Sequence, residues 1–200
     1  MPKSIFILGK GGFASEVRWL LREINRHRQG EWRLIDCYED DTKARQNDPA
    51  KVAFVIAIGH PRIRQRLAHE FDEAAYQAAT LRHPSVLAAE DLKMGAGSIV
   101  CARSTLTTNI RIGQHSHINL HCTIGHDVVI GDFVSLSPGV HISGGVRIGN
   151  GVDIGTGAVV LPGLTIAAGT IIGAGAVVHR NIDEAGTYVG VPARRLDQSN

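Results

Sequence analysis

The stretch INLHCTIGHDVVIGDFVSLSPGVHISG, from Ile118 to Gly144, carries an aliphatic residue at every sixth position. The series continues in both directions without an insertion and comprises Met94, Val100, Leu106, Ile112, Ile118, Ile124, Ile130, Leu136, Ile142, Ile148, Ile154, Val160, Ile166, Ile172 and Val178. A period of six fits neither the 3.6-residue turn of an α-helix nor the two-residue alternation of an ordinary strand. It is the hexapeptide repeat of a parallel β-helix, whose short sides stack coil upon coil. The sequence therefore predicts a β-solenoid over residues 94–178.

A second ladder follows each aliphatic residue by four positions. Its members are mostly small or β-branched: Ser116, Cys122, Val128, Val134, Val140, Val146, Val152 and Ala158. Three hexads close one coil, so residues 18 apart are expected to stack. This places His126 between Thr108 and Gly144, with Pro162 beyond. Because the two ladders fill the interior, the chemistry is expected on the outer surface or between subunits.

The first 80 residues follow a different pattern. Apolar runs at 4–8, 32–38 and 52–59 alternate with helical patterns that begin near Ala14 and Ile63. Strands that alternate with helices predict a small parallel α/β sheet. The boundary is expected after residue 82, which gives an α/β domain over 1–82 and a β-helix domain over 83–200. Residues 179–200 leave the period and are expected to cap the last coil.

Composition excludes several classes of partner. The formal net charge is +2 without a basic block, which gives no support for binding to nucleic acid or to an anionic membrane. The three cysteines show no paired spacing, and no run of about 18 apolar residues could span a bilayer. The start has no signal-peptide pattern, so a cytoplasmic protein is expected.

His126 and Asp127 form the first candidate for chemistry. A neutral imidazole at a coil corner can act as a general base near pH 7, and an adjacent carboxylate raises its basicity. The alternative is a surface histidine beside a solvated acid. The lack of a side chain at Gly144, one coil away, leaves space beside His126 and favours the catalytic interpretation.

Histidines suggest a metal site as a second candidate. Imidazoles are good zinc ligands, and a β-helix can present several. No cysteine pair strengthens this pattern, and the alternative is a set of surface residues at corners. The residues are His115, His117, His121, His126 and His141.

A glycine-rich turn is the third candidate. Gly9, Gly11 and Ala14 match the G-x-G-x-x-G/A turn between a strand and a helix, where backbone N–H groups meet phosphate. The alternative is a helix-capping turn with no ligand. A full dinucleotide fold needs more chain than this, so a single nucleotide is expected rather than NAD.

Taken together, these motifs resemble the hexapeptide-repeat sugar acetyltransferases, and more narrowly the sialic acid O-acetyltransferases and the UDP-4-amino-sugar N-acetyltransferases of bacillosamine synthesis. The resemblance covers nearly the whole chain. It is carried by FILGKGGFASEV, CYEDD, FVIAIGHPRIRQRL, LRHPS, the block from 118 to 144, VVLPG and VGVPARRL. It implies a left-handed β-helix, a Rossmann-like N-terminal domain and a homotrimer that uses acetyl-CoA and needs no metal.

The resemblance also implies roles for single residues. His126 would be the general base and Asp127 the acid that tunes it. The nucleotide-sugar site would be lined by Gly11, Gly12, Phe13, Asp40, Asp41 and Gly59. The acetyl-CoA groove, between neighbouring subunits, would be lined by Ser135, Gly144, Thr156 and Ala174. Ser135 stands where the N-acetyltransferase relatives carry a second histidine, and Phe13 replaces a polar residue of their turn.

The expected function is acetyl transfer from acetyl-CoA to the amine of a nucleotide-activated 4-amino-4,6-dideoxy sugar in bacterial surface-glycan synthesis. His126 would take the proton of the attacking amine, and the N–H of Gly144 would stabilise the oxyanion. Three alternatives stay open: O-acetylation of sialic acid, a zinc β-helix hydratase resembling the γ-carbonic anhydrases, and a non-catalytic trimeric scaffold.

Overall fold

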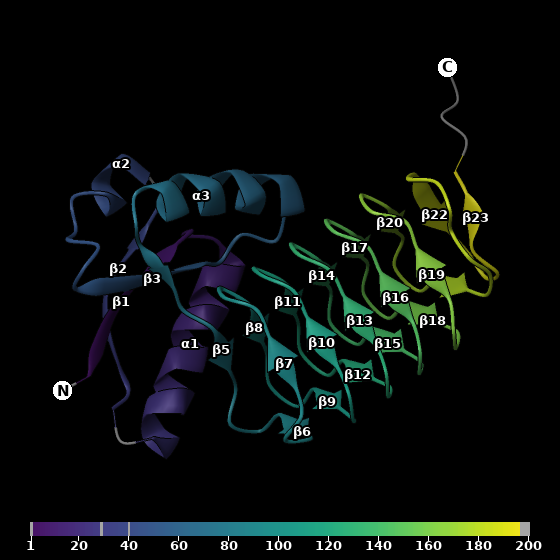
Figure 1. Cartoon of the computed structure of the whole chain (residues 1–200), viewed down its shortest axis with the longest axis horizontal. Helices are drawn as coiled ribbons and strands as arrows, with labels where there is room; N and C mark the ends of the chain where they lie inside the picture. Colours follow the sequence, from purple (N-terminus) through teal and green to yellow (C-terminus); the bar gives the residue numbers. More distant parts are fainter. Residues whose placement is uncertain (1, 29, 40, 197–200) are drawn as a thin grey trace.

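The structure, a computed structural model, describes residues 2–28, 30–39 and 41–196. The prediction made for Asp40 therefore lies outside the described residues. Figure 1 shows an α/β part at one end of the molecule and a long solenoid that leads away from it to the C-terminus.

The α/β part is a parallel sheet flanked by helices. Its elements in chain order are β1 Lys3–Leu8, α1 Gly12–His27, β2 Trp32–Tyr38, α2 Asp41–Ala44, β3 Val52–Ile56, α3 Pro61–Glu73 and β4 Gln77–Ala78. The strand order is β2-β1-β3-β4, and every pair is parallel. One face of the sheet packs against α1 and the other against α3, each through its own apolar cluster. The three predicted strands and two predicted helices are confirmed.

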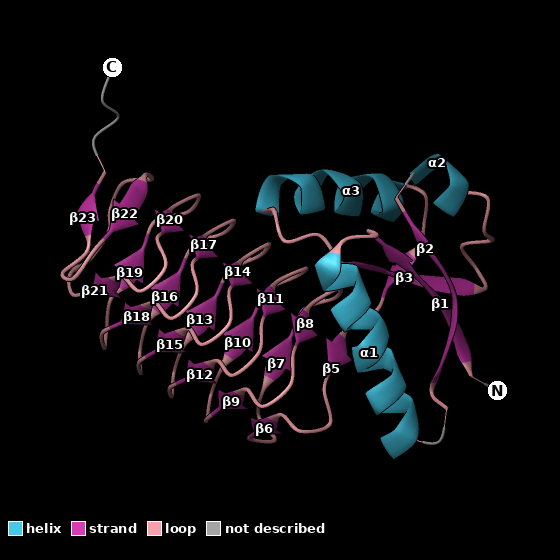
Figure 2. Ribbon diagram, turned by 180° about the vertical axis from the view of Figure 1, so that it is seen from behind, coloured by secondary structure: helices cyan, strands magenta, loops and turns pink. Residues whose placement is uncertain are grey.

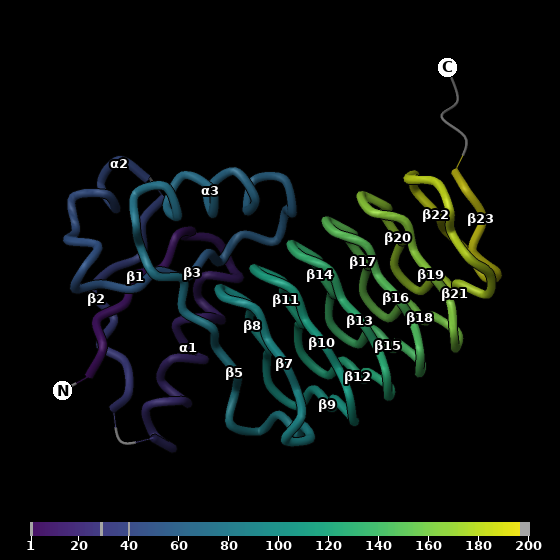
Figure 3. The backbone as a smooth tube through the Cα atoms, in the orientation of Figure 1, coloured from purple at the N-terminus to yellow at the C-terminus, as the bar shows by residue number. Residues whose placement is uncertain are grey.

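The remaining strands form a left-handed β-solenoid of three sheets, whose strands pair in parallel from coil to coil, drawn as a continuous tube in Figure 3. The β5 sheet contains β5 Leu81–Arg82, β8 Ile99–Val100, β11 His117–Ile118, β14 Ser135–Leu136, β17 Asp153–Ile154, β20 Ile171–Ile172, β22 Thr187–Val189 and β23 Arg194–Arg195. The β6 sheet contains β6 Leu87–Ala88, β9 Thr105–Leu106, β12 Thr123–Ile124, β15 His141–Ile142, β18 Val159–Val160 and β21 Val177–Val178. The β7 sheet contains β7 Lys93–Met94, β10 Arg111–Ile112, β13 Val129–Ile130, β16 Arg147–Ile148 and β19 Thr165–Ile166.

The predicted register is confirmed. Residues 18 apart pair across neighbouring coils, as Ile118 does with Leu136 and Ile124 with Ile142. One continuous apolar cluster contains the aliphatic ladder together with the second ladder from Cys122 to Ala158. Every residue of that second ladder is fully buried, because each coil is too narrow to admit water between its three sides.

Left-handed backbone recurs at every sixth residue and turns the chain from one side of a coil to the next. Later coils place glycine there, as at Gly139 and Gly145, where a positive φ carries little steric cost. Earlier coils place other residues in the same conformation, among them His115 and Asp127. Gly144 is outside this series, so its lack of a side chain has another cause.

The solenoid begins close to the predicted boundary and ends in a cap. Strand β5 pairs with β8 in register, so Leu81 already lies in the first coil. The division at residue 82 stays a prediction. At the other end, β22 continues the β5 sheet and β23 closes it in antiparallel orientation. Among the described residues, no helix has the length and apolar character needed to cross a membrane.

We expect the stability of the fold to decline in mild acid because of His115. Its imidazole stacks between the rings of Phe54 and Phe133, with centroids 6.0 and 5.5 Å away. Burial, aided by the charge of Arg64, lowers the pKa of His115 to about 4, whereas the unfolded chain titrates near 6.5. The unfolded state therefore binds a proton between these values that the folded state does not.

The neutral imidazole of His115 makes its full contribution to the free energy of unfolding above pH 6.5. Below that pH, the free energy of unfolding falls by about 1.4 kcal/mol per pH unit as the pH drops toward 4. Urea unfolding at pH 7.0 and about pH 5.5 measures it. His115→Asn, which tolerates the left-handed backbone, should reduce the difference between the two pH values. An equal difference in both proteins would contradict this assignment.

Candidate active site

His126 and Asp127 lie side by side on the exposed turn between β12 and β13. Asp127 adopts a φ of 60°, a conformation that aspartate tolerates better than most residues. Its Oδ2 lies 2.8 Å from Nδ1 of His126, and its Oδ1 accepts a hydrogen bond of 2.6 Å from Asn109. The hydrogen bond from His126, followed by that from Asn109, lowers the pKa of Asp127. The carboxylate is therefore ionised at neutral pH, and a proton on Nδ1 leaves Nε2 free to act as a base.

Nε2 of His126 lies directly over Gly144, one coil further along. A Cβ at Gly144 would come within 2.5 Å of that nitrogen. The carbonyl of Gly144 accepts the N–H of Gly163 at 2.9 Å, but its own N–H donates to no described residue. At another corner, by contrast, Asn150 Oδ1 accepts the N–H of Asp132 at 2.9 Å. Position 162, which follows Gly144 by 18 residues, is proline and offers no such side-chain acceptor. A potential base and a free N–H donor therefore lie next to each other.

Gly144→Ala should abolish most activity without unfolding the protein. The new methyl group would meet the end of an exposed imidazole, which can turn away at little cost to the fold. Displacing a reacting group by about 1 Å can lower the rate by about 10²-fold. Turnover and melting temperature, measured on the same preparation, test this.

Gly125→Ala provides the contrast. Its methyl group would come 2.6 Å from the backbone nitrogen of Gly144, which cannot turn aside, so the coil should be destabilised. An equal loss of melting temperature in Gly144→Ala and Gly125→Ala would contradict this prediction. It would mean that the backbone, and not the His126 side chain, has to move to admit the methyl group at position 144.

A separate cavity lies between the start of α1 and the β5 sheet. It has a volume of about 260 Å³ and is lined by Phe13, Glu16, Gly59, His117, Asn119, Ser135, Leu136, Ser137 and Asp153. Gly11 is the N-cap of α1 and Gly12 is its first residue, and both are exposed. The structure thus brings together Phe13 and Gly59, two of the residues predicted for the nucleotide-sugar site.

Ser135 lines the same cavity, and its hydroxyl is bound within the chain. The hydroxyl donates to the carbonyl of Gly59 at 2.8 Å and accepts from Arg64 at 2.9 Å. Thr156 and Ala174 are exposed on the turns that follow β17 and β20, at a different edge of the solenoid from Gly144. One chain therefore does not bring the four residues predicted for the acetyl-CoA groove into one row. Their contact with the cofactor stays a prediction.

Asp41 begins α2, next to the carboxyl end of β2. Its carboxylate forms an ion pair of 3.2 Å with Arg45, which also binds Glu70 on α3. Asp41 does not line the cavity beside Phe13. Its predicted role in nucleotide binding is untested.

His126 and the cavity beside Phe13 lie on different sides of the chain. His126 is at the corner between the β6 and β7 sheets, whereas the cavity opens against the β5 sheet. His126 is absent from the residues that line the cavity. If both serve one reaction, a second copy of the chain has to supply one of them.

The five histidines do not gather into one site. His115 and His117 are buried at the junction with the α/β part, and His126 pairs with Asp127. His121 is exposed at a corner, and His141 interacts with Thr123 on the neighbouring strand. No group of three metal-binding side chains occurs within residues 2–28, 30–39 and 41–196.

A larger cavity of about 610 Å³ was not predicted. His60, Arg62 and Gln65 from the start of α3 line one side, and Asp132, Asn150 and Asp153 line the other. Asp153 is shared with the smaller cavity, and burial raises the pKa of its carboxyl group. The sequence contains a signal for the wall of the smaller cavity, which Asp153 shares: His117, Ser135 and Asp153 are 18 residues apart and occupy the outward position of successive strands.

Comparison with protein families supports the repeat architecture. A family model described as bacterial transferase hexapeptide, with six repeats, matches residues 121–162. A GDP-perosamine N-acetyltransferase of Escherichia coli O157:H7 is 36% identical over 77 residues. That match covers 38% of this chain and 35% of the relative, so the chain aligns with about a third of that protein.

Solved structures match over almost the entire chain. The acetyltransferase domain of PglB from Neisseria gonorrhoeae FA1090, in complex with acetyl coenzyme A, superimposes with a TM-score of 0.91 at 25% identity, covering 98% of this chain and 100% of that one. A mutant perosamine N-acetyltransferase from Caulobacter crescentus, in complex with CoA and GDP-perosamine, gives 0.90 at 28% identity and covers 98% and 97%. WeeI from Acinetobacter baumannii AYE gives 0.86 at 30% identity and covers 96% and 99%.

Proposed function

Because the chain belongs to the hexapeptide-repeat family of sugar acetyltransferases, we propose that it transfers an acetyl group from acetyl-CoA to the amine of a nucleotide-activated amino sugar of the 4-amino-4,6-dideoxy type. The observation that carries this proposal is the position of Nε2 of His126 over Gly144, whose N–H is unbound among the described residues. Relatives that match the full chain were solved with acetyl coenzyme A, or with CoA and GDP-perosamine. Surface-glycan synthesis is the corresponding biological setting.

The reaction is a direct transfer. The acceptor amine attacks the thioester carbonyl while Nε2 of His126 takes its proton. The N–H of Gly144 donates to the oxyanion of the tetrahedral intermediate. Collapse of the intermediate breaks the carbon–sulfur bond, and the departing thiolate receives the proton from His126 to give CoA. The proposal includes no acyl-enzyme: Cys122, the cysteine nearest to His126 in the sequence, is buried, and burial raises the pKa of its thiol to about 11.

The acceptor binds to the N-terminal part of the chain, residues 1–82, which we propose is a Rossmann-like domain. The turn through Gly11, Gly12 and Phe13 offers backbone N–H groups at the N-terminus of α1, where a phosphate is favoured. Gly59 lies in the loop after the neighbouring strand β3, and Asp41 lies shortly after β2, so all three loops meet at the carboxyl edge of the sheet. The sugar extends toward the cavity lined by Phe13 and Gly59.

Acetyl-CoA lies along the solenoid and needs no metal. Gly144 at one edge and Thr156 and Ala174 at another become two walls of one groove if solenoids pack side by side. Ser135 lies instead on the β5 sheet and lines the cavity beside Phe13, with its hydroxyl bound to Gly59, so we place it with the acceptor. A homotrimer would create three such grooves and would bring His126 of one subunit to the acceptor bound by the next, which accounts for their separation within one chain.

Asp127→Asn should lower turnover at least about tenfold. Asparagine keeps the left-handed turn but cannot hold the Nδ1 proton of His126 with a negative charge. Steady-state kinetics at saturating substrates measure the effect, and an unchanged melting temperature serves as the control. Wild-type turnover in this variant would remove Asp127 from the mechanism.

The alternatives have less support. Two of the relatives reported above are named for a sugar substrate, and in both that sugar is perosamine. This favours an amine acceptor over the hydroxyl of sialic acid. A zinc hydratase would need a third ligand beside His121 and His126. The described residues contain no group of three side chains that could hold a metal. A pure scaffold leaves the His126–Gly144 arrangement without a purpose.

The test is release of free thiol from acetyl-CoA over a panel of acceptors. The panel holds UDP-, dTDP- and GDP-linked 4-amino-4,6-dideoxy sugars, GDP-perosamine included, beside free and CMP-linked sialic acid. We expect release with a nucleotide-linked amino sugar. Release with sialic acid alone would replace this proposal with O-acetylation, and no release with any acceptor would overturn it.

A further inference from the structure

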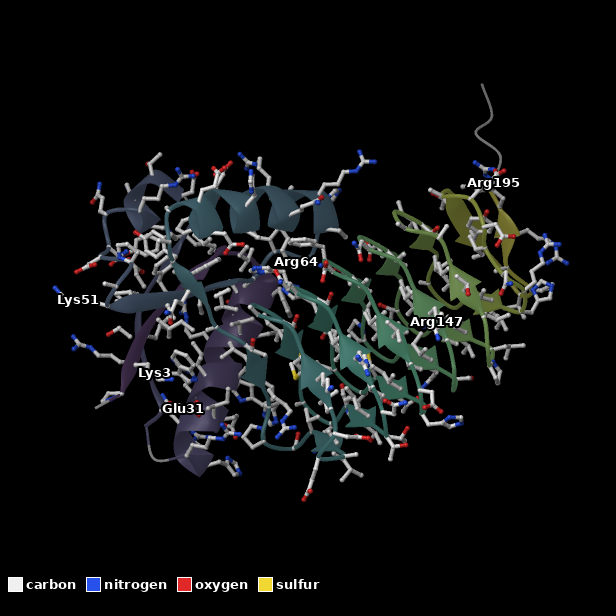
Figure 4. All side chains as sticks on the ribbon, in the orientation of Figure 1. Lys3, Glu31, Lys51, Arg64, Arg147 and Arg195 are labelled. Carbon is white, nitrogen blue, oxygen red and sulfur yellow. The ribbon has the colours of Figure 1, made fainter. Side chains whose placement is uncertain are left out.

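Arg64 is the one residue of α3 whose charged end is fully enclosed at the junction with the solenoid, where Figure 4 labels it. All five of its N–H groups have acceptors. Nε–H donates to the carbonyl of His115 at 2.6 Å. One terminal nitrogen donates to Ile58 O at 2.8 Å and Gly59 O at 2.9 Å. The other donates to Phe133 O at 2.8 Å and Ser135 Oγ at 2.9 Å, with Val134 O at 3.2 Å.

These acceptors come from both halves of the molecule. Ile58 and Gly59 form the loop after β3 in the α/β part. His115 precedes β11, and Phe133 precedes β14 one coil later, because the two residues are 18 apart. Figures 1 and 2 show from opposite sides that α3 lies beside these first coils. A single planar guanidinium therefore fixes the β3 loop against two successive coils.

Stability alone does not account for such a residue. Arg64 is 0% exposed and forms no ion pair with the described carboxylates, so its charge is balanced only by carbonyl and hydroxyl oxygens. Burial lowers the pKa of Arg64 to about 10, an effect that the charge of Asp153 only partly opposes. Enclosing a cation in this way is costly, and an apolar side chain would join the two surfaces at lower cost.

What the guanidinium adds is geometry at the cavity beside Phe13. Gly59 and Ser135 line that cavity from opposite halves of the molecule. Arg64 binds both, and the Ser135 hydroxyl also donates to the Gly59 carbonyl at 2.8 Å. The three groups form a closed triangle of hydrogen bonds behind the cavity wall. Since the guanidinium fork is rigid, the distance between the two walls is fixed.

We infer that Arg64 is a positioning residue for the acceptor: it holds the Gly59 loop, and with it the nucleotide-sugar site, at a set distance from the solenoid. The inference rests on the proposed function. Of the four residues predicted for the acetyl-CoA groove, Arg64 binds only Ser135, whose hydroxyl is turned to Gly59, and it touches none of Gly144, Thr156 and Ala174. Its loss should therefore weaken productive binding of the acceptor and leave binding of acetyl-CoA unchanged.

Arg64→Lys tests this, because lysine keeps the charge but has three donors in place of five. With GDP-perosamine as the varied acceptor, we expect its KM to rise at least about tenfold, since small misplacements of a bound substrate are costly. The KM for acetyl-CoA should change less than about twofold. Arg66→Lys is the matched control, on the same helix but exposed and paired with Glu70.

Ser135→Ala keeps the inference testable if Arg64→Lys does not fold. It removes the hydroxyl that links Arg64 to Gly59 and leaves the guanidinium bound to its carbonyl acceptors. The acceptor KM should rise several-fold while the acetyl-CoA KM stays constant. A change in the acetyl-CoA KM alone would instead make Ser135 a cofactor contact and contradict the inference.

Two outcomes separate this inference from the proposed function. An active wild-type protein whose Arg64→Lys variant melts lower but keeps its acceptor KM would make Arg64 purely structural and overturn the inference alone. A wild-type protein that transfers acetyl groups to no acceptor would overturn the proposed function and this inference with it.

Discussion

His126→Ala lowers turnover by about 10²-fold or more, the usual contribution of a general base, and leaves the fold intact. The imidazole is 69% exposed and packs over a glycine, so its removal opens no cavity in the core. The loss should appear in kcat, because the proton moves only as the amine attacks. Steady-state kinetics with both substrates varied measure it.

His126→Asn distinguishes the role of His126 as a base from its role as a hydrogen-bond partner of Asp127. Asparagine can still interact with Asp127 but cannot accept a proton at neutral pH. Both variants should therefore be equally slow and should melt at the wild-type temperature. Full activity in either variant would show that the solvent or another group takes the proton, and that His126 is not the base.

Ile148→Asp should abolish folding of the solenoid. Ile148 is 3% exposed and lies in the middle of the aliphatic ladder, between Ile130 and Ile166 on neighbouring coils. The substitution removes a large apolar contact and buries a carboxyl group without a partner, at an expected cost of more than about 4 kcal/mol. Insoluble protein, or the loss of a cooperative thermal transition, is the expected observation.

Arg147→Asp is the matched control because it places the same side chain on the adjacent residue. Arg147 is exposed on β16 and is labelled in Figure 4, so the introduced charge stays in water. This protein should fold and melt close to the wild type. Soluble, thermally unchanged Ile148→Asp would mean that the register of the ladder, and every position derived from it, is wrong.

The register could be predicted because a solenoid repeats one local arrangement. Once the period of six is recognised, pairing at 18 residues follows, and the stacking of His126 on Gly144 follows from the pairing. The first sheet could be predicted as well, from apolar runs and the helices between them. The short elements α2 and β4 were missed, since four and two residues carry too little periodicity.

The junction between the two halves could not be predicted from the sequence. Arg64 reads as one of several basic residues on an amphipathic helix, yet its partners lie 51 to 71 residues away on the solenoid. The same contacts decide that the Ser135 hydroxyl points to Gly59. Only the docking of α3 against particular coils brings these groups together, and that docking depends on long-range packing.

The outward-facing side chains of the β5 sheet could be predicted only in part. His117, Ser135 and Asp153 follow from the register as neighbours on one face. The sequence does not show that this face is covered by the α/β part, which turns a polar surface strip into the wall of two cavities. Burial then lowers the pKa of His117 and raises that of Asp153.

The central claim is acetyl transfer to the amine of a nucleotide-linked sugar, and identification of the product tests it most directly. The wild-type protein would be incubated with acetyl-CoA and GDP-perosamine, and the sugar product would be examined by mass spectrometry and NMR. We predict a product that is heavier by one acetyl group, with that group in amide linkage to the 4-amino nitrogen. An unmodified sugar, or an acetyl group in ester linkage to a hydroxyl, would contradict the account.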